Sequence, residues 1–143
     1  MLKVRDLMTS PVFSLRENDS LHTARELMNL QRIRHIPIVT VDNTFSGLLT
    51  HRDILSATIS KLAGLDPETQ KEIDSGIPIH EIMRTDLTSV EPGTPLKNAA
   101  QLLLNHKYGC LPVVENGLLV GIVTEADFLR LTINLMEGLD AED

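Results

Sequence analysis

The sequence contains two copies of one pattern, and this internal repeat limits the fold more than any other feature does. Val4 aligns with Ile79 at a shift of 75 residues, and one deletion between Asn116 and Gly121 changes the shift to 74. A duplicated unit is therefore the expected architecture. The identical pairs, thirteen in all, are Met8 and Met83, Ser14 and Ser89, Leu21 and Leu96, Ala24 and Ala99, Leu27 and Leu102, Pro37 and Pro112, Val39 and Val114, Gly47 and Gly121, Thr50 and Thr124, Asp53 and Asp127, Leu55 and Leu129, Thr58 and Thr132, and Ile59 and Ile133.

Each copy has the hydrophobic pattern of a strand, a helix, two strands and a second helix. In the first copy the expected elements span 13–15, 20–31, 35–40 and 45–49, and a helix begins at Thr50. In the second copy the strands span 88–90, 111–114 and 119–123. Thr94 and Pro95 suggest an N-cap followed by Pro at the first helical position, and a final helix begins at Thr124.

The expected fold class is α/β (α+β), with two βαββα units packed sheet to sheet about a pseudo-twofold axis. One unit alone is too small to bury both faces of its sheet. The expected organisation is a first repeat at 1–61, a linker at 62–78, a second repeat at 79–136 and an acidic tail at 137–143. Asp66 and Pro67 indicate that the linker is partly helical, and the tail is expected to fray.

Composition excludes several function classes. The net charge is −7 without a basic run, which argues against nucleic acid and anionic membrane surfaces as partners. No apolar stretch is long enough to span a membrane and no signal peptide opens the chain, so a cytoplasmic location is expected. Cys110 lies in an apolar run, which favours a buried reduced thiol. The five histidines lack metal-ligand spacing, so no metal site is expected.

Both copies carry Gly-x-x-Thr-x-x-Asp where the last strand meets the last helix, at Gly47, Thr50 and Asp53 and again from Gly121. The structural interpretation is a helix cap resembling a capping box, with Gly permitting a tight approach of the strand. The recurrence beside an apolar-Pro-Val/Ile strand resembles the cystathionine-β-synthase (CBS) family over roughly 1–61 and 76–136. That resemblance implies a Bateman module, which binds adenine nucleotides in two clefts between its repeats.

The resemblance also implies roles for individual residues. Asp53 and Asp127 would accept hydrogen bonds from ribose hydroxyls, because a carboxylate is a good acceptor for a diol. Thr50 and Thr124 would contact phosphate at a helix N-terminus, which presents free N–H groups to an anion. The purine would lie against the apolar backbone of either copy, at Ile36 and Pro37 or at Leu111 and Pro112.

The two copies differ in charge around these positions. The first has Arg34-His35 and His51-Arg52, where the second has Gly109-Cys110 and Glu125-Ala126. Either these arginines are simply solvated, or the first copy supplies the charge that neutralises phosphate and the two clefts are not equivalent. The ligand-binding set therefore includes Arg34, His35 and Arg52 with the residues of the motif.

The expected function is regulatory, and the chain is not expected to be an enzyme. An adenine nucleotide (AMP, ADP or ATP) or a related adenosyl ligand would bind, and a conformational change would signal to an unidentified regulated protein. No cofactor is required beyond that ligand. By resemblance to stand-alone pairs of the acetoin-utilisation type, a homodimer is expected. The alternatives are a ligand-free dimerisation scaffold and a nucleotide-processing enzyme, which would need a base and a metal that the sequence does not offer.

Overall fold

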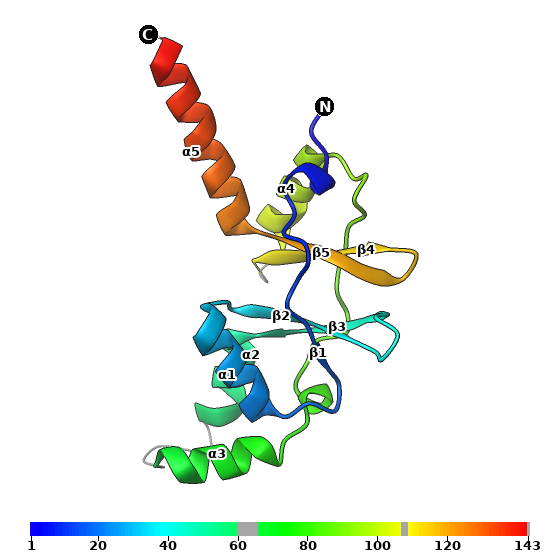
Figure 1. Ribbon diagram of the computed structural model, residues 1–143, viewed down its shortest axis with the longest axis vertical. Helices are drawn as coiled ribbons and strands as arrows, with labels where there is room; N and C mark the ends of the chain where they lie inside the picture. Colours follow the sequence, from blue (N-terminus) through cyan, green and yellow to red (C-terminus); the bar gives the residue numbers. More distant parts are fainter. Residues whose placement is uncertain (60–65, 107–108, 143) are drawn as a thin grey trace. The chain divides into compact units, whose positions relative to one another are not determined.

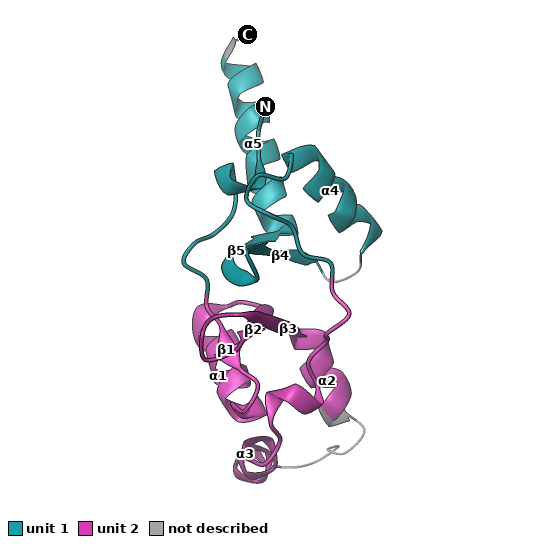
Figure 2. Cartoon of the chain, turned by 90° about the vertical axis from the view of Figure 1, so that its right-hand side faces the viewer, with its two compact units in different colours: residues 1–12, 88–143 teal, residues 13–87 magenta. Residues whose placement is uncertain are grey.

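The computed structural model describes residues 1–59, 66–106 and 109–142, and these residues form two compact units. The terminal unit consists of residues 1–12 and 88–143, and the central unit consists of residues 13–87. They are unit 1 and unit 2 in Figure 2. Each unit has its own apolar core, so each is described by itself.

The central unit contains a small sheet with helices (Figure 1). The strand order is β1-β2-β3, with β1 parallel to β2 and β2 antiparallel to β3. Buried aliphatic side chains from α1, β2, β3 and α2 form its core. Its elements are β1 (Leu15–Arg16), α1 (Leu21–Gln31), β2 (His35–Val39), β3 (Phe45–Thr50), α2 (His51–Ile59), α3 (Pro67–Ser75) and the 3-10 turn η2 (Ile79–Glu81).

The terminal unit contains the antiparallel hairpin of β4 and β5 with two helices. Val90 contributes one parallel bridge to Val113 in place of the expected first strand. Pro92 and Gly93 follow closely, and both residue types disfavour a strand, so the pairing ends after one bridge. The elements are the 3-10 turn η1 (Val4–Asp6), α4 (Leu96–Asn105), β4 (Cys110–Glu115), β5 (Leu118–Thr124) and α5 (Glu125–Glu142).

The mixed α/β prediction is confirmed, and so are the hairpin turns. Asn116 and Gly117 have φ of 54° and 81°, as a two-residue hairpin turn with both central residues at positive φ requires. In the central unit Asn43 has φ of 67°. The pKa of Asp42 is held below its ordinary value by hydrogen bonds, mainly from the Thr40 hydroxyl and next from the Thr44 hydroxyl.

Two predicted helix ends differ from the structure. Pro95 is the N-cap of α4 and not its first helical residue, because the Thr94 hydroxyl accepts the Glu91 N–H at 3.1 Å instead of capping the helix. The expected acidic tail at 137–143 is helical as far as it is described, since α5 continues to Glu142. Good helix-forming residues fill this segment, and the helix tolerates Gly138.

Part of the segment expected as a partly helical linker is described, and it contains the helix α3. Asp66 is the N-cap of α3 and accepts the Thr69 N–H at 2.8 Å, with Pro67 at the first helical position. This hydrogen bond holds the pKa of Asp66 below its ordinary value. Residues 62–65 of the predicted linker lie outside the described part of the chain.

The compact units do not coincide with the sequence repeats. The leading segment of the first repeat, residues 1–12, packs with the rest of the second repeat, and the leading segment of the second repeat, residues 79–87, packs with the rest of the first. In the terminal unit the Val4 N–H bonds to the Thr94 carbonyl at 2.9 Å. In the central unit the Ile79 N–H bonds to the Asp19 carbonyl at 2.9 Å. Val4 and Ile79 are both fully buried, so each leading segment contributes to a core.

Candidate functional site

The recurrent motif lies where a hairpin strand runs directly into a helix. In the central unit β3 ends at Thr50 and α2 begins at His51. The antiparallel register places His35 opposite Thr50, and the His51 N–H bonds to the Arg34 carbonyl at 2.9 Å. The start of the apolar-Pro strand therefore lies beside the motif.

The terminal unit repeats this arrangement. Cys110 pairs with Thr124, and the Glu125 N–H bonds to the Gly109 carbonyl at 3.1 Å. The structure thus divides the predicted site residues into two groups. The central unit holds Arg34, His35, Ile36, Pro37, Thr50, Arg52 and Asp53, and the terminal unit holds Leu111, Pro112, Thr124 and Asp127.

Thr50 and Asp53 form a reciprocal cap at the start of α2. The Thr50 N–H donates to Asp53 Oδ2 at 3.1 Å, and the Asp53 N–H donates to Thr50 Oγ1 at 3.1 Å. These bonds satisfy two backbone donors that an uncapped helix would leave free. The capping interpretation of the motif is confirmed for this copy.

Thr124 and Asp127 begin α5 with a related but different set of bonds. The Thr124 N–H donates to Asp127 Oδ2 at 2.8 Å, and the Thr124 hydroxyl donates to the same oxygen at 3.2 Å. The Asp127 residue is only 6% exposed. A carboxylate this buried needs such partners, so the motif has a structural role in both copies.

The motif glycines allow the leading segments to cross the hairpins closely. A Cβ on Gly47 would lie 2.7 Å from the Arg84 carbonyl oxygen, and one on Gly121 would lie 2.8 Å from Met8 Sδ. Real Cβ atoms do not approach other atoms so closely. The expectation that Gly serves a tight approach is confirmed, and the neighbour is the leading segment of the other repeat.

Two arginines that the sequence did not single out bind the motif carboxylates. Arg84 contacts Asp53 Oδ1 through Nε at 3.0 Å and through Nη2 at 2.9 Å. Arg130 Nη2 contacts Asp127 Oδ1 at 2.6 Å. Arg130 lies three residues after Asp127 on one helix, a spacing readable from sequence. Arg84 lies 31 residues from Asp53, and no local pattern connects them.

The remaining predicted site residues have contrasting exposures. Arg34 and Arg52 are exposed, and His35 is half-buried. The side chains of Ile36 and Leu111 lie in the two apolar cores, and Pro37 and Pro112 are buried. These apolar side chains are therefore packed inside the units, and the expected contact of a purine with the backbone at these positions stays a prediction.

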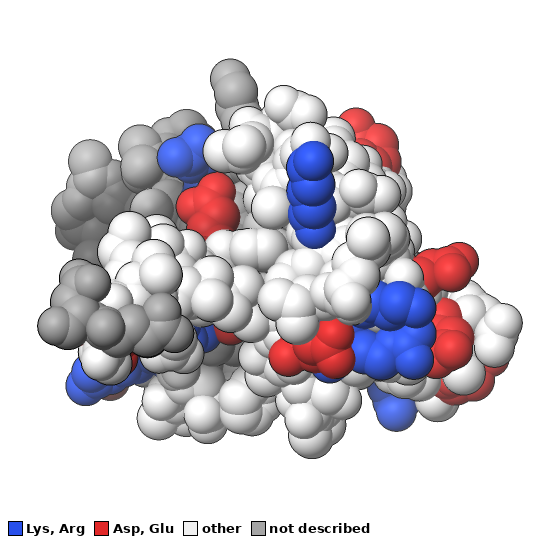
Figure 3. Space-filling model, turned by 90° about the horizontal axis from the view of Figure 1, so that it is seen from above, with Lys and Arg blue, Asp and Glu red and all other residues white. Residues whose placement is uncertain are grey.

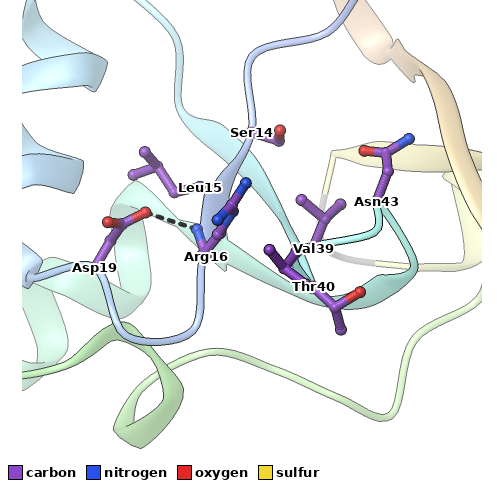
Figure 4. Close-up of a pocket in the computed structure, with 8 residues that line it drawn as sticks. Ser14, Leu15, Arg16, Asp19, Val39, Thr40 and Asn43 are labelled. Carbon is purple, nitrogen blue, oxygen red and sulfur yellow. Dashed lines mark hydrogen bonds between the residues drawn. The ribbon is translucent and has the colours of Figure 1, made fainter.

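A pocket of about 410 Å³ lies at the other end of β2 from the motif. Figure 4 shows the Arg16 N–H donating to Asp19 on one side of it, with Thr40 and Asn43 on the other. None of the predicted site residues lines this pocket, and the sequence did not predict it. The lining residues are Ser14, Leu15, Arg16, Asp19, Val39, Thr40, Val41 and Asn43.

Other kinds of site are not found in the described ranges. Within 1–59, 66–106 and 109–142, no three His, Cys, Asp or Glu residues are grouped to hold a metal ion. Among those same residues, no helix combines the length and apolarity that a membrane span requires. On the face in Figure 3, Lys and Arg side chains lie in several separate places, and the blue group at the lower right lies beside Asp and Glu.

Cys110 is buried, as its apolar surroundings predicted. Burial raises the pKa of its thiol to about 12. The thiolate is the reactive form, so this residue is unreactive in the folded chain.

Comparison with known proteins places this geometry in a family. The pattern of the CBS domain matches residues 4–60 and 79–134. A protein of Vibrio cholerae assigned to acetoin utilization (AcuB) is similar, with 38% identity, a TM-score of 0.83 and 98% coverage of both chains. The structure of CBSX2 in complex with AMP has 27% identity and a TM-score of 0.79, covering 95% of this chain and 99% of that one.

A further similar structure is the CBS domain pair of protein MJ0100 in complex with 5-methylthioadenosine and S-adenosyl-L-methionine. It has 25% identity and a TM-score of 0.78, and the match covers 94% of this chain and 98% of that one. Each of the two matched ranges contains one copy of the strand-to-helix motif. This chain belongs to the CBS domain family and carries two CBS domains in tandem.

Proposed function

We propose that this chain is a regulatory module that senses an adenine nucleotide or a related adenosyl ligand. The observation that carries the proposal is the motif in both copies, set at a strand-to-helix junction beside the apolar-Pro strand. Two similar CBS pairs are complexes with AMP and with methylthioadenosine and S-adenosylmethionine. Ligand binding changes the conformation, and an unidentified protein reads that change in the cytoplasm.

Each motif residue has a chemical role in this proposal. Asp53 and Asp127 accept hydrogen bonds from the vicinal ribose hydroxyls. Thr50 and Thr124 present a hydroxyl at a helix N-terminus, where N–H groups and the helix dipole favour phosphate. Arg34 and Arg52 are exposed, so both can reach a bound phosphate from solvent. The central unit therefore favours phosphorylated ligands more than the terminal unit does.

The direct test is a ligand screen that follows binding and turnover together. AMP, ADP, ATP and S-adenosylmethionine are each added to the purified chain, with thermal shift, calorimetric titration and product analysis as readouts. We expect stabilisation without turnover, because ligand that binds only the folded chain raises its stability. Stabilisation accompanied by hydrolysis would instead support the nucleotide-processing enzyme, and an absence of binding by all four would refute the proposal.

The motif carboxylates are tested one at a time. Asp53→Ala and Asp127→Ala each remove a charged acceptor, and such hydrogen bonds contribute roughly 1.5–3 kcal/mol, about 10- to 150-fold in affinity. Asp53→Ala should weaken ligand binding at the central motif alone, and Asp127→Ala should weaken it at the terminal motif alone. A lowered melting temperature with unchanged affinity would mean that the carboxylates only cap helices.

The proposal includes a homodimer. Apolar side chains at helical spacing on α5 are exposed, including Leu129 at 64%, Ile133 at 52% and Met136 at 57%. An apolar stripe on a helix is normally buried against another element. Light scattering at micromolar concentration should give twice the chain mass, and Ile133→Glu should shift the protein toward monomer. A monomer in the unmodified protein would contradict this part of the proposal.

A ligand-free scaffold is the second candidate function. The observation that favours it is that Asp53 and Asp127 already bind backbone N–H groups and an arginine each. A carboxylate engaged in this way could have been retained for stability alone. The ligand screen separates the two candidates, since a scaffold would dimerise and bind none of the four ligands.

A further inference from the structure

The carboxylates of the two motifs are held by arginines of very different origin. Arg84 belongs to a leading segment that pairs with β3, where the Arg84 N–H donates to the Leu48 carbonyl at 2.8 Å and the Leu48 N–H donates to the Arg84 carbonyl at 2.9 Å. Its guanidinium contacts both oxygens of Asp53, with Nε at 3.0 Å and 3.3 Å. The backbone pairing holds the Cα of Arg84 beside the motif.

The terminal unit has no arginine at the matching position. Thr9 occupies it, and its backbone makes the same paired bonds, to Ile122, at 2.9 Å and 3.1 Å. Asp127 binds Arg130 instead, through one guanidinium nitrogen at 2.6 Å. The Arg130 side chain is 67% exposed and lies on the same helix, so it can leave the carboxylate by changing rotamer.

The two carboxylates differ in the arginine that a ligand has to displace, and not in burial, since the Asp127 side chain is itself only 8% exposed. The Asp53 side chain is 10% exposed and the Arg84 side chain 40%. A two-point contact between a guanidinium and a carboxylate is stronger and more oriented than a one-point contact. A neutral ribose diol must compete with this two-point contact at Asp53, whereas at Asp127 it competes with a single contact from the exposed Arg130 side chain.

We propose that Arg84 is a specificity-determining residue that makes the central motif selective for phosphorylated adenosine ligands, an inference that rests on the proposed function. An anionic phosphate attracts the guanidinium through its solvent-facing side and so releases Asp53 to accept the ribose hydroxyls. A neutral adenosine offers no such replacement for the carboxylate. The terminal motif, with Thr9 in place of Arg84, accepts adenosyl ligands that lack a phosphate.

The experiment compares AMP with adenosine, because the two ligands share base and ribose and differ only in phosphate. Calorimetric titration of the full chain with each ligand gives the preference for AMP at each class of sites. Arg84→Thr places the residue of the second copy in the first, and Lys71→Thr on α3 is the control that removes one positive charge elsewhere in the same unit. Melting curves accompany every titration.

We expect Arg84→Thr to bind adenosine more tightly and AMP more weakly at the sites of the central motif. The preference of these sites for AMP should fall at least about tenfold, the equivalent of about 1.4 kcal/mol. Arg84→Lys keeps the charge without the two-point contact and should retain most of the preference. Lys71→Thr should leave it within about twofold. A structural role alone would move the melting temperature and leave the AMP preference unchanged.

The possible failures are distinguishable. If the unmodified chain binds AMP and adenosine and Arg84→Thr leaves the preference unchanged, the inference is overturned and the proposed function stands. If the unmodified chain binds neither AMP nor adenosine, the inference is overturned, and the screen with ADP, ATP and S-adenosylmethionine decides whether the proposed function fails with it. If Arg84→Thr does not fold, Thr9→Arg decides the question: it should weaken adenosine about tenfold at the terminal motif, and unchanged binding there overturns the inference.

Discussion

The central and terminal units build the same junction but complete it with different charges. In both, a hairpin strand enters a helix at Thr, an Asp three residues later bonds to the Thr N–H, and a glycine admits the leading segment of the other repeat. Around Asp53 a distant arginine makes a two-point contact, while around Asp127 a neighbour on the helix makes one. After duplication the backbone frame of a repeat can persist while the charges that decide its chemistry diverge.

The largest expected loss of stability is at Gly47 and Gly121, where a leading segment crosses each hairpin. Gly47→Ala would place Cβ 2.7 Å from the backbone oxygen of Arg84, whereas Gly121→Ala would place it 2.8 Å from the flexible Met8 side chain and 3.0 Å from the backbone oxygen of Thr9. Overpacking costs about 1–3 kcal/mol, so we expect roughly 3 kcal/mol at Gly47 and about 1–2 kcal/mol at Gly121 in urea unfolding. Gly138→Ala, with nothing within 4 Å, is the control and should be neutral or slightly stabilising. Equal losses at the two crossings would contradict this comparison.

The second test concerns the linker helix of the central unit. Arg25 on α1 contacts Asp74 on α3, whose side chain is 1% exposed and also accepts from Gln70 at 2.8 Å. Removing one partner leaves a buried charge unpaired, and because Arg25 is 25% exposed, we expect Arg25→Ala to cost about 2 kcal/mol. Arg25→Met with Asp74→Leu should recover most of the loss, as measured by chemical unfolding. A double variant as unstable as the single one would count against this explanation.

The two caps give a smaller and more local difference. Thr50 Oγ1 accepts the Asp53 N–H, whereas the Thr124 hydroxyl donates to a carboxylate that also accepts the Thr124 N–H. Thr50→Val removes a cap acceptor and should cost about 1 kcal/mol. Thr124→Val leaves the backbone bond in place and should cost about half as much. Melting curves of both variants, with Thr→Ser at each site as the rescue, measure the difference.

The smallest expected effect concerns the reactivity of Cys110, which can be measured on the unmodified chain. Its counterpart in the first copy is His35, which is half-buried, while Cys110 is buried and its thiol has a pKa of about 12. Alkylation by iodoacetamide at pH 8 should proceed only as fast as the chain opens. An unfolded thiol loses its proton near pH 8.5, so its contribution to stability should fall as pH rises from there toward 12. Rapid alkylation of the native chain would show that the thiol is accessible.

Local pattern was enough to predict the longer helices and the hairpin strands in their order, but not the short first strand of each copy. The helix from Ser20, the strands around Pro37 and Pro112 and the helix from Asp66 each follow from signals within a few residues. The capping pair of Thr50 and Asp53 is local for the same reason. Thr94 misled the prediction, because its hydroxyl can accept from Glu91 as easily as from the helix, and the sequence does not rank these two partners.

Interactions across long separations were outside the reach of pattern. Nothing near Asp53 indicates Arg84, and nothing near Gly47 indicates that the segment at 83–84 crosses it. Both depend on which repeat receives each leading segment, and that choice is made by packing of the whole unit. The pocket at Arg16 and Thr40 likewise brings together two turns that are far apart in the chain.

The exchange of leading segments has a consequence for how such a chain could have arisen. Each hairpin receives residues that belong, by sequence, to the other repeat. A shorter protein with one repeat would have to obtain that segment from a second molecule, as in a domain-swapped dimer. Gene duplication and fusion would then convert an exchange between molecules into one within a single chain, and partner and register would no longer depend on protein concentration.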